Sequence, residues 1–448
     1  MVPGLPVRAL VWLLIGLVLS FAVPASAKQF DVDSFTLANG LQVVVVPFHR
    51  APAVTQMLWY KAGAYDDPPG KSGIAHFLEH LMFRGTKETP PGEFSRIVSQ
   101  NGGRENASTS PDYTVFFQTV AADRLDLVMK LEAERMHDLL ITEDKATPER
   151  EVIIEERRSR IDNVPAALLN EQRDAVLFLN SHYRLPAIGW LSEMRGLSAD
   201  DARRFYATWY APNNAVLVIA GDVDLARVRA LAETYYGPIP PHPVPVHEAL
   251  AEPPKVAATR LEMTSGHVAS PEWSRSYLAP GYIEAGGKLA DALTVLAEIL
   301  GGGESARLYR SLVIDKKLAV SVGAGYGPYR GAGSFSLYAE PKDGVSVADI
   351  EAAIMAEIRR VLSEGISAAE VDRVKNRLQA SALYSRDSLS GVARIIGASL
   401  VAGRSLEEIQ AWPERIGAVT PEEIMAAARQ VFKDDAGVTA VLLPEKRS

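Results

Sequence analysis

The sequence contains no cysteine among its 448 residues. Without thiols the chain has neither a disulfide framework nor a thiolate metal ligand, which leaves histidine, aspartate and glutamate as candidate ligands. Basic residues are in the minority, with 47 Lys and Arg against 55 Asp and Glu, and the net charge is −8. This charge repels phosphate backbones and anionic lipids, and no basic patch with interleaved aromatic residues offsets it. We therefore expect no nucleic-acid partner.

A long apolar run occurs only at the N-terminus. Arg8 precedes nearly continuous apolar sequence from Ala9 to Val23, and Ala25-Ser26-Ala27 has the small-x-small pattern of a signal-peptidase site. Because the run is shorter than the ~20 residues needed to span a bilayer, we predict a cleaved signal peptide over 1–27 and no stable membrane anchor. An uncleaved anchor is the alternative. Export combined with the absence of cysteine indicates a bacterial periplasm.

The length of the chain exceeds what one hydrophobic core usually organises, so we expect at least two domains. Seven prolines between Pro238 and Pro254 favour extended backbone and indicate a linker. We place this linker at 238–260, between residues 28–237 and a second part of similar length at 261–448.

The two parts share a faint internal repeat. Ser198–Asp201 is a capping-box pattern at the start of a predicted helix that leads to a predicted strand over Ala215–Ala220. Thr420–Glu423 has the same pattern, ahead of a predicted strand over Val438–Leu443. Short capping patterns recur by chance, so this pattern alone does not establish a duplication.

The segment His76-Phe77-Leu78-Glu79-His80 points most directly to a chemistry. We expect a helix over 74–83, capped by Ser72, on which residues four apart lie on one face. The two histidines can then reach one zinc ion, while Glu79 faces the water that attacks a substrate. The alternative is a pair of surface histidines flanking an acid, and the apolar neighbours in the segment favour the metal site.

This motif and three others resemble those of the pitrilysin, insulysin and mitochondrial processing peptidase family. The zinc helix of that family has the order His-x-x-Glu-His, the inverse of the commoner His-Glu-x-x-His. The resemblance rests on His76–His80, on Gly102-Gly103 with Asn106–Thr109, on Glu149-Arg150 with Glu156, and on Pro186–Gly189. It implies an α+β fold of two homologous halves, each with mixed β-sheets flanked by α-helices, which form half of a clam-like peptidase. Residues 28–237 would be the zinc-binding peptidase domain, and 261–448 a homologous domain without the zinc motif.

The resemblance also implies the remaining site residues. In the family the third ligand follows a Glu-Arg or Glu-Lys pair by seven residues on a later helix, expected here over 148–160, which favours Glu156 over its neighbour Glu155. Seven residues make nearly two helical turns, so Glu149 shares a face with Glu156 and acts behind it in the catalytic site. Asn106-Ala107 resembles the family's edge strand, which binds a substrate through main-chain hydrogen bonds.

These residues predict a zinc-dependent endopeptidase with one Zn²⁺ per chain, held by His76, His80 and Glu156. Three protein ligands leave a fourth position for water, as in catalytic zinc sites, and Glu79 is the expected general base. The expected substrates are extended peptides or unfolded polypeptides. The alternatives are a catalytically silent structural subunit and a peptide-binding subunit that keeps zinc for structure.

The second half departs from the family's pattern. Active members have, after a glycine-rich stretch and a Ser-Arg-Leu run, an Arg and, seven residues later, a Tyr that reach the substrate. With Gly301–Gly303 and Ser305–Leu308 setting the register, these positions fall on Val313 and Val320. We therefore expect the zinc-binding subunit of a split two-chain bacterial type, whose homologous partner subunit supplies Arg and Tyr. The alternative source within this chain is a shifted loop containing Tyr326, Tyr329 and Arg330.

We predict that the mature protein begins at Lys28, because the signal-peptidase pattern ends at Ala27. N-terminal sequencing of the protein from a periplasmic extract tests this. Recovery of an intact Met1 terminus in the membrane fraction would instead support the uncleaved anchor.

Overall fold

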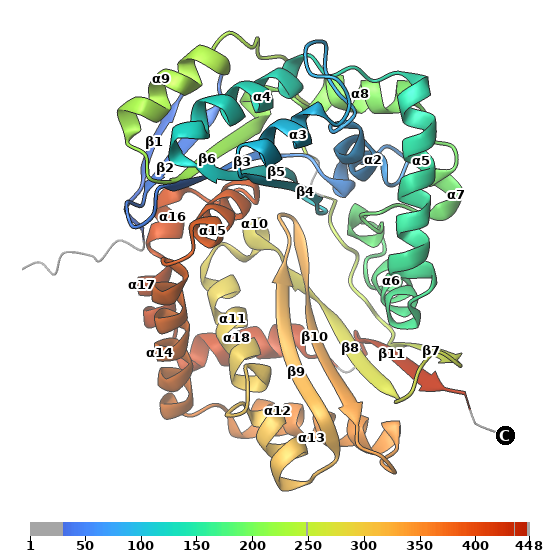
Figure 1. Ribbon diagram of the computed structural model, residues 1–448. Helices are drawn as coiled ribbons and strands as arrows, with labels where there is room; N and C mark the ends of the chain where they lie inside the picture. The colour runs from blue at the N-terminus through green and yellow to red at the C-terminus, as the bar shows by residue number, and fades with distance from the viewer. Residues whose placement is uncertain (1–29, 248–249, 434, 446–448) are drawn as a thin grey trace, which may run out of the picture.

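The structure of the protein, a computed structural model, describes residues 30–247, 250–433 and 435–445. The predicted signal peptide over 1–27 and its cleavage site lie outside these residues. Two mixed β-sheets dominate the fold, one above the other in Figure 1, and helices flank both. The fold class is therefore α+β, as predicted. No helix in the described ranges is long and apolar enough to cross a membrane.

Between residue 30 and the linker, strands and helices alternate irregularly. The strands are β1 (Asp33–Thr36), β2 (Gln42–Pro47), β3 (Ala53–Tyr60), β4 (Arg104–Thr109), β5 (Thr114–Ala121) and β6 (Ala215–Gly221). The helices are α2 (Ile74–Leu81), α3 (Glu93–Gln100), α4 (Leu125–His137), α5 (Glu143–Arg157), α6 (Pro165–Leu177), α7 (Leu191–Met194), α8 (Ala199–Trp209) and α9 (Leu225–Tyr235).

The described residues from 240 to 258 form no helix or strand. After them come the strands β7 (Thr259–Ser265), β8 (Glu272–Pro280), β9 (Ala319–Pro328), β10 (Ala332–Pro341) and β11 (Val438–Pro444). The helices of this second half are α10 (Tyr282–Ala285), α11 (Lys288–Gly301), α12 (Arg307–Tyr309), α13 (Val347–Glu364), α14 (Ala368–Ser385), α15 (Leu389–Val401), α16 (Leu406–Gln410), α17 (Trp412–Ala418) and α18 (Pro421–Val431).

The two sheets share one topology. Their strand orders are β1-β2-β6-β3-β5-β4 and β7-β11-β8-β10-β9, so the second sheet repeats the first without an equivalent of β1. In each sheet the strand nearest the end of its half pairs in parallel with the first common strand, β6 with β2 and β11 with β7. All the other pairs are antiparallel. This correspondence supports the internal repeat.

The predicted capping boxes begin equivalent helices. The hydroxyl of Ser198 accepts from the N–H of Asp201, whose carboxylate accepts from the N–H of Ser198, at the start of α8. Thr420 and Glu423 form the same box at the start of α18. Each helix leads into a central strand of its sheet, β6 or β11, most of whose residues are buried. The local pattern in the sequence therefore marks the same position in both halves.

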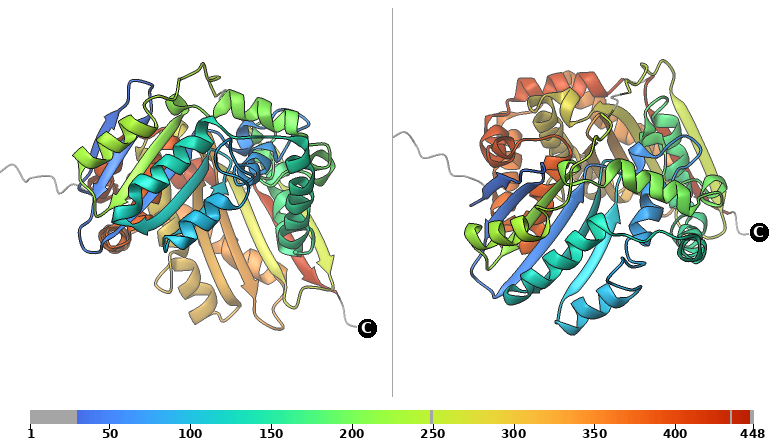
Figure 2. Two further views of the ribbon diagram at one scale, coloured as in Figure 1. Left: turned by 45° about the horizontal axis from the view of Figure 1, so that its top comes forward. Right: turned by 90° about the horizontal axis from the view of Figure 1, so that it is seen from above.

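Each sheet is covered on one face by a helix from the other half. Helix α15 contacts β3 and β6 of the first sheet, while α6 contacts β7, β8 and β11 of the second. In Figure 1, α15 lies directly beneath the first sheet and α6 lies above β11 and β7. Seen from above in Figure 2, the orange and red helices of the second half and the green helices α5 and α6 lie toward opposite ends of the molecule. Each half therefore keeps its own main core, and smaller apolar clusters join the two halves.

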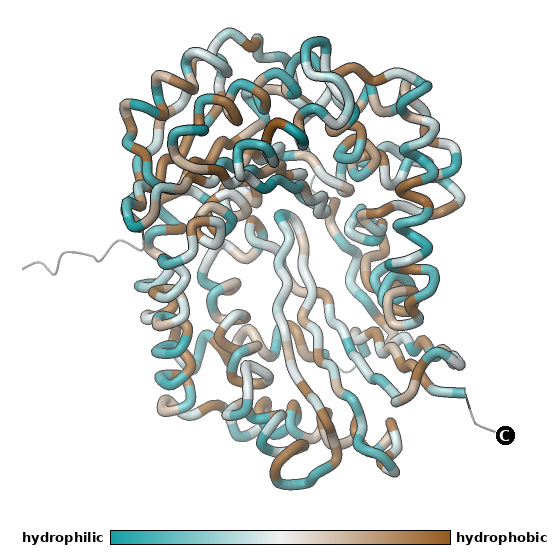
Figure 3. The backbone as a smooth tube through the Cα atoms, in the orientation of Figure 1, coloured by the Kyte–Doolittle hydropathy of each residue, from teal (hydrophilic) through white to brown (hydrophobic). Residues whose placement is uncertain are grey.

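The part of the second sheet that α6 leaves uncovered, on strands β9 and β10, has a more polar surface. Strands β9 and β10 are pale or teal over much of their length in Figure 3, because Gly and Ser alternate with apolar residues there. Ser334 and Ser336 are half-buried and Tyr338 is exposed. This face is polar and open, whereas the opposite face packs on the core of the second half.

One close contact between the halves joins α15 to β3. Trp59 on β3 is fully buried, and it packs in one cluster with Val392, Ala393 and Ile396 of α15. A Cβ placed on Gly397 of α15 would lie 2.1 Å from Nε1 of Trp59. No side chain fits at Gly397 unless the tryptophan or the helix moves.

We predict that Gly397→Ala destabilises the protein by about 1–3 kcal/mol, the usual cost of overpacking a core. Thermal unfolding should show a lower midpoint. Gly417→Ala in α17 is the matched control, because the added methyl would meet only the amide end of Gln379 and the change gains helix propensity. Equal midpoints for the two variants would show that the contact with Trp59 does not hold α15 in place.

Candidate metal centre

Helix α2, which carries the two histidines of the motif, begins at a tight turn. Gly73 precedes it with φ 87°, a left-handed conformation that favours glycine. The buried carboxylate of Asp67 accepts hydrogen bonds from the N–H groups of Gly73 (2.6 Å) and Ala75 (3.1 Å). The predicted cap, Ser72, is wrong, since its hydroxyl accepts instead from the N–H of Trp190 (2.9 Å). A side chain earlier in the loop has taken over the capping of α2.

The apolar side of α2 fixes the direction of its histidines. Phe77 and Leu78 are fully buried and Leu81 is 1% exposed, all within the core of the first half. Helix α2 also contacts α5, the helix that bears the predicted third ligand. His76 and His80 are therefore held on the side of α2 that faces α5.

Helix α5 starts earlier than expected. It begins at Glu143 rather than at 148, with Pro148 inside it, and continues as one π-helical turn over Arg158–Asp162. Proline in this position removes one backbone hydrogen bond. Burial of Ala146, Ile153 and Ile154 in the core of the first half compensates for this loss.

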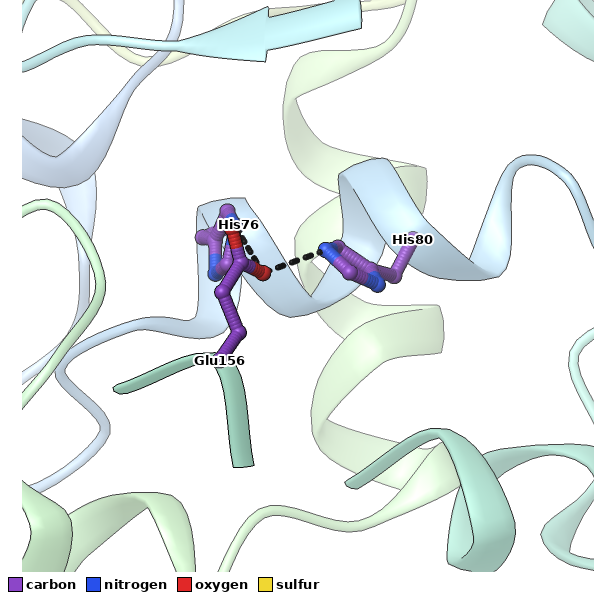
Figure 4. Close-up of side chains that lie close together, drawn as sticks. All are labelled: His76, His80 and Glu156. Carbon is purple, nitrogen blue, oxygen red and sulfur yellow. Dashed lines mark ion pairs between the residues drawn. The ribbon is translucent and has the colours of Figure 1, made fainter. Parts of the chain in front are cut away.

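Two imidazoles and one carboxylate converge between these helices (Figure 4). Oε2 of Glu156 lies 3.5 Å from Nε2 of His76 and 3.2 Å from Nε2 of His80. One donor atom from each of the three residues lies within 4.8 Å of the others, and no other set of three potential metal ligands comes together in this way within the described residues. Two nitrogens and one oxygen form the donor set of a catalytic zinc site, so these residues fit a zinc ion.

The neighbouring acid, Glu155, lies away from this cluster. Its side chain is 69% exposed and pairs with Arg158 on the surface at 3.0 Å. Glu156 uses its second oxygen, Oε1, to pair with Arg160 at 2.8 Å. Of the two acids, only Glu156 has an oxygen directed at both histidines.

Glu149 lies directly behind His80. Its Oε1 is 2.8 Å from Nδ1 of His80, and its other oxygen pairs with Arg84. A carboxylate that accepts from one ring nitrogen fixes the orientation of the imidazole and keeps the other nitrogen available for a metal. The two-turn spacing from Glu156 thus places Glu149 where a supporting acid is needed.

The pKa values of the two histidines shift in opposite directions. Burial opposes protonation of His80, but hydrogen bonds to Glu149 and Glu156 outweigh it and raise its pKa to about 9. Burial, together with the neighbouring His80, lowers the pKa of His76 to about 4. In the metal-free protein at neutral pH, His80 therefore holds a proton that a metal would displace, and metal binding weakens as the pH falls.

Glu79 lies on α2 between the two histidines and is 9% exposed. Its Oε2 accepts a hydrogen bond from Oγ1 of Thr109, on strand β4, at 2.5 Å. Burial raises the pKa of Glu79, an environment in which a carboxylate serves better as a proton acceptor. Thr109 belongs to the segment Asn106–Thr109, which resembles the family's edge strand, but no spacing in the sequence links it to Glu79.

Strand β4 is the last strand of the first sheet, so one of its edges is unpaired within the described residues. Asn106 is exposed, and Ala107 packs against the core of the first half. The N–H of Ala107 donates to Oδ1 of Asn106 at 2.9 Å. A peptide docking on this edge would replace that side-chain contact with a main-chain one.

The residues considered as a substitute for the missing Arg and Tyr have other partners. Tyr326 donates its hydroxyl to the carbonyl of Pro280 at 2.6 Å. Tyr329 stacks on Tyr183, with ring centroids 4.5 Å apart. Arg330 is buried: its main-chain N–H donates to Asp112 of the first half at 2.8 Å, and its guanidinium lies 3.9 Å from Oδ1 of Asp66 and over the ring of Tyr65. Val320, at the predicted position of the Tyr, is 57% exposed.

Comparisons with known proteins identify the family. Residues 42–189 match the family model described as "Insulinase (Peptidase family M16)", and residues 196–378 match the model described as "Peptidase M16 inactive domain". The chain is 31% identical to a protein of Helicobacter pylori named zinc protease PqqE, over 92% of this chain and 93% of that protein. The chain belongs to peptidase family M16. An uncharacterised zinc protease of Streptomyces coelicolor is 27% identical, over 89% of this chain and 86% of that protein.

Solved structures of two bacterial proteases have the same fold. A protease from Helicobacter pylori superposes with a TM-score of 0.86 at 30% identity, over 92% of this chain and 100% of that one. The periplasmic protease PqqL from Escherichia coli gives a TM-score of 0.78 at 21% identity, over 94% of this chain but 48% of PqqL. This M16 chain is thus similar in fold to about half of PqqL.

We predict that Glu156→Ala loses most of its zinc, because it removes one of three ligands. Glu155→Ala is the matched control and should keep one zinc per chain, since its exposed side chain is paired with Arg158. Metal analysis after dialysis measures both. Zinc retained in Glu156→Ala and lost in Glu155→Ala would show that the neighbouring acid is the ligand.

Proposed function

We propose that this chain is the zinc-binding subunit of an endopeptidase that hydrolyses extended peptides or unfolded polypeptides. The observation that supports this best is the convergence of His76, His80 and Glu156 beside a fourth, buried acid, Glu79. A structural zinc site has no need of that fourth acid. The membership in M16 and the names of the relatives agree with a zinc-dependent protease.

Each residue of the site has a defined task in this proposal. When bound, zinc supplies Lewis-acid chemistry, which polarises the scissile carbonyl and acidifies water. Glu79 accepts the proton of the attacking water and returns it to the leaving amine. Glu149 holds the N–H of Nδ1 in His80, which keeps the opposite nitrogen directed toward the metal.

The open edge of β4 provides a place for the substrate. An extended peptide that pairs with Asn106 and Ala107 adds a strand to the first sheet, and main-chain hydrogen bonds then hold it without regard to most side chains. Because Thr109 of the same strand contacts Glu79, this docking places the peptide beside the general base. Broad tolerance of substrate sequence follows from binding through the main chain.

The site still lacks the Arg and Tyr that active members bring to the substrate. Val313 and Val320 stand at their positions, and the side chains of Tyr326, Tyr329 and Arg330 contact other groups of this chain. We therefore propose a homologous partner subunit that supplies both side chains. Similarity to the separately solved first half of PqqL, with a TM-score of 0.77, supports a clam assembled from two such chains.

We further propose that the protein works in the periplasm after removal of residues 1–27. The apolar N-terminal segment and the absence of cysteine support this location. PqqL, a relative in fold, is described as periplasmic.

A catalytically silent subunit is the second candidate function. It is favoured by the match of residues 196–378 to a model described as an inactive domain, and by Val313 and Val320. The first half, however, keeps Glu79 at the centre of the motif, and a silent subunit has no use for a buried acid there. We therefore rank the peptidase first.

We predict that Glu79→Gln, tested with the partner present, leaves a zinc-loaded protein that no longer cleaves peptides, because the amide keeps the shape but loses the basic oxygen.

We also predict that the chain alone is slow, because it lacks the Arg and Tyr. Loss of a transition-state donor costs about 3 kcal/mol, roughly a hundredfold in rate. The assay is hydrolysis of an unstructured fluorogenic peptide, with and without chelator, by the chain alone and after addition of a candidate partner, the product of the neighbouring gene.

Two results would contradict these proposals separately. Full activity of the lone chain would exclude the need for a partner. Absence of hydrolysis in the mixed sample, with zinc bound and both proteins folded, would favour the silent subunit.

A further inference from the structure

Glu79 has one hydrogen-bond donor among the side chains of the described residues. Oγ1 of Thr109 lies 2.5 Å from Oε2 of Glu79. An ionised carboxylate can only accept, so the hydroxyl must be the donor. Thr109 also lies 3.5 Å from Oγ1 of Thr114, a weaker contact, and the hydroxyl of Thr114 already donates to the carbonyl of Ala62 at 3.0 Å. The hydroxyl of Thr109 is therefore free to serve Glu79.

Thr109 is the last residue of β4, opposite Thr114 in the ladder with β5. Side chains alternate along this strand, so that Glu105, Ala107 and Thr109 are half-buried and the residues between them are exposed. Figure 1 shows β4 at the end of the first sheet nearest α2, and the two elements are in contact. Strand β4 therefore has one unpaired edge, and the side chain of its last residue contacts Glu79.

We propose that Thr109 is a positioning residue for the reaction: its hydroxyl fixes one oxygen of Glu79 and leaves the other for the water. Strand β4 would then hold both the docked peptide and, through Thr109, the general base. The inference rests on the proposed role of Glu79. A carboxylate free to rotate about its last bond would spend less time in the reactive orientation, and binding of substrate would be unaffected. Thr109 should therefore act on kcat and not on KM.

Thr109→Val removes the hydroxyl and keeps the shape, while Thr109→Ser keeps the hydroxyl. In the complex with the partner, we expect the valine variant to lose at least about tenfold in kcat, a part of what a general base supplies, with KM and zinc content unchanged. The serine variant should keep most of the rate. A change in KM without a change in kcat, or an equal loss of kcat in both variants, would overturn the proposal.

A second measurement does not depend on activity. In the metal-free protein, Thr109→Val should lower the unfolding midpoint when Glu79 is present, because a buried carboxylate loses its donor. In a Glu79→Ala background the same change should have no such effect. An equal shift in both backgrounds would show that the two side chains do not interact. This cycle decides the contact even if peptide hydrolysis is not found, so failure of the proposed function and failure of this inference are distinguishable.

Discussion

The arrangement of the fold follows from one constraint: each sheet has apolar residues on both of its faces, and the helices of its own half cover only one face. Helix α15 of the second half closes the first sheet over Trp59, and α6 of the first half closes the second sheet, with Leu169 against Ala440 and Leu442. Apolar surface left open on either sheet would cost about 25 cal/mol per Å². The exchange of helices therefore joins the two halves into one body.

The metal centre inherits its geometry from this exchange. Glu156 lies near the end of α5, and a single π-helical turn, Arg158–Asp162, connects α5 to the exchanged helix α6. Arg157, 4% exposed, pairs with Glu171 of α6 at 2.7 Å and donates to the carbonyl of Gly189 at 2.7 Å. The position of the third donor is thus tied both to the loop that precedes α7 and to the packing of the second sheet.

Burial sets the electrostatics of the same region. It raises the pKa of Glu79 and lowers that of His76, while paired carboxylates raise the pKa of His80. Unpaired charges are costly in such a place, so a motif of this kind persists only with supporting partners such as Glu149, Arg84 and Thr109. These supporting contacts agree with the proposed role of the site in metal-assisted hydrolysis.

Features that depend on neighbours within two helical turns could be predicted from the sequence. The four-residue spacing of His76 and His80 and the seven-residue spacing of Glu149 and Glu156 place each pair on one helix face, and the structure brings these residues together. The capping boxes at α8 and α18 were visible for the same reason. The predicted strands and helices favoured an α+β class of two halves, and the resemblance supplied the clam.

Tertiary structure alone decided what depends on contacts between distant segments. Asp67 caps α2 in place of Ser72, and α5 begins at Glu143, before Pro148. The hydroxyl of Thr109 contacts Glu79, which lies 30 positions away in the chain. The exchange of α6 and α15 joins residues more than 200 positions apart. Periodicity along the sequence reports only which face of an element is apolar, whereas the partner of that face is set by how the whole chain packs.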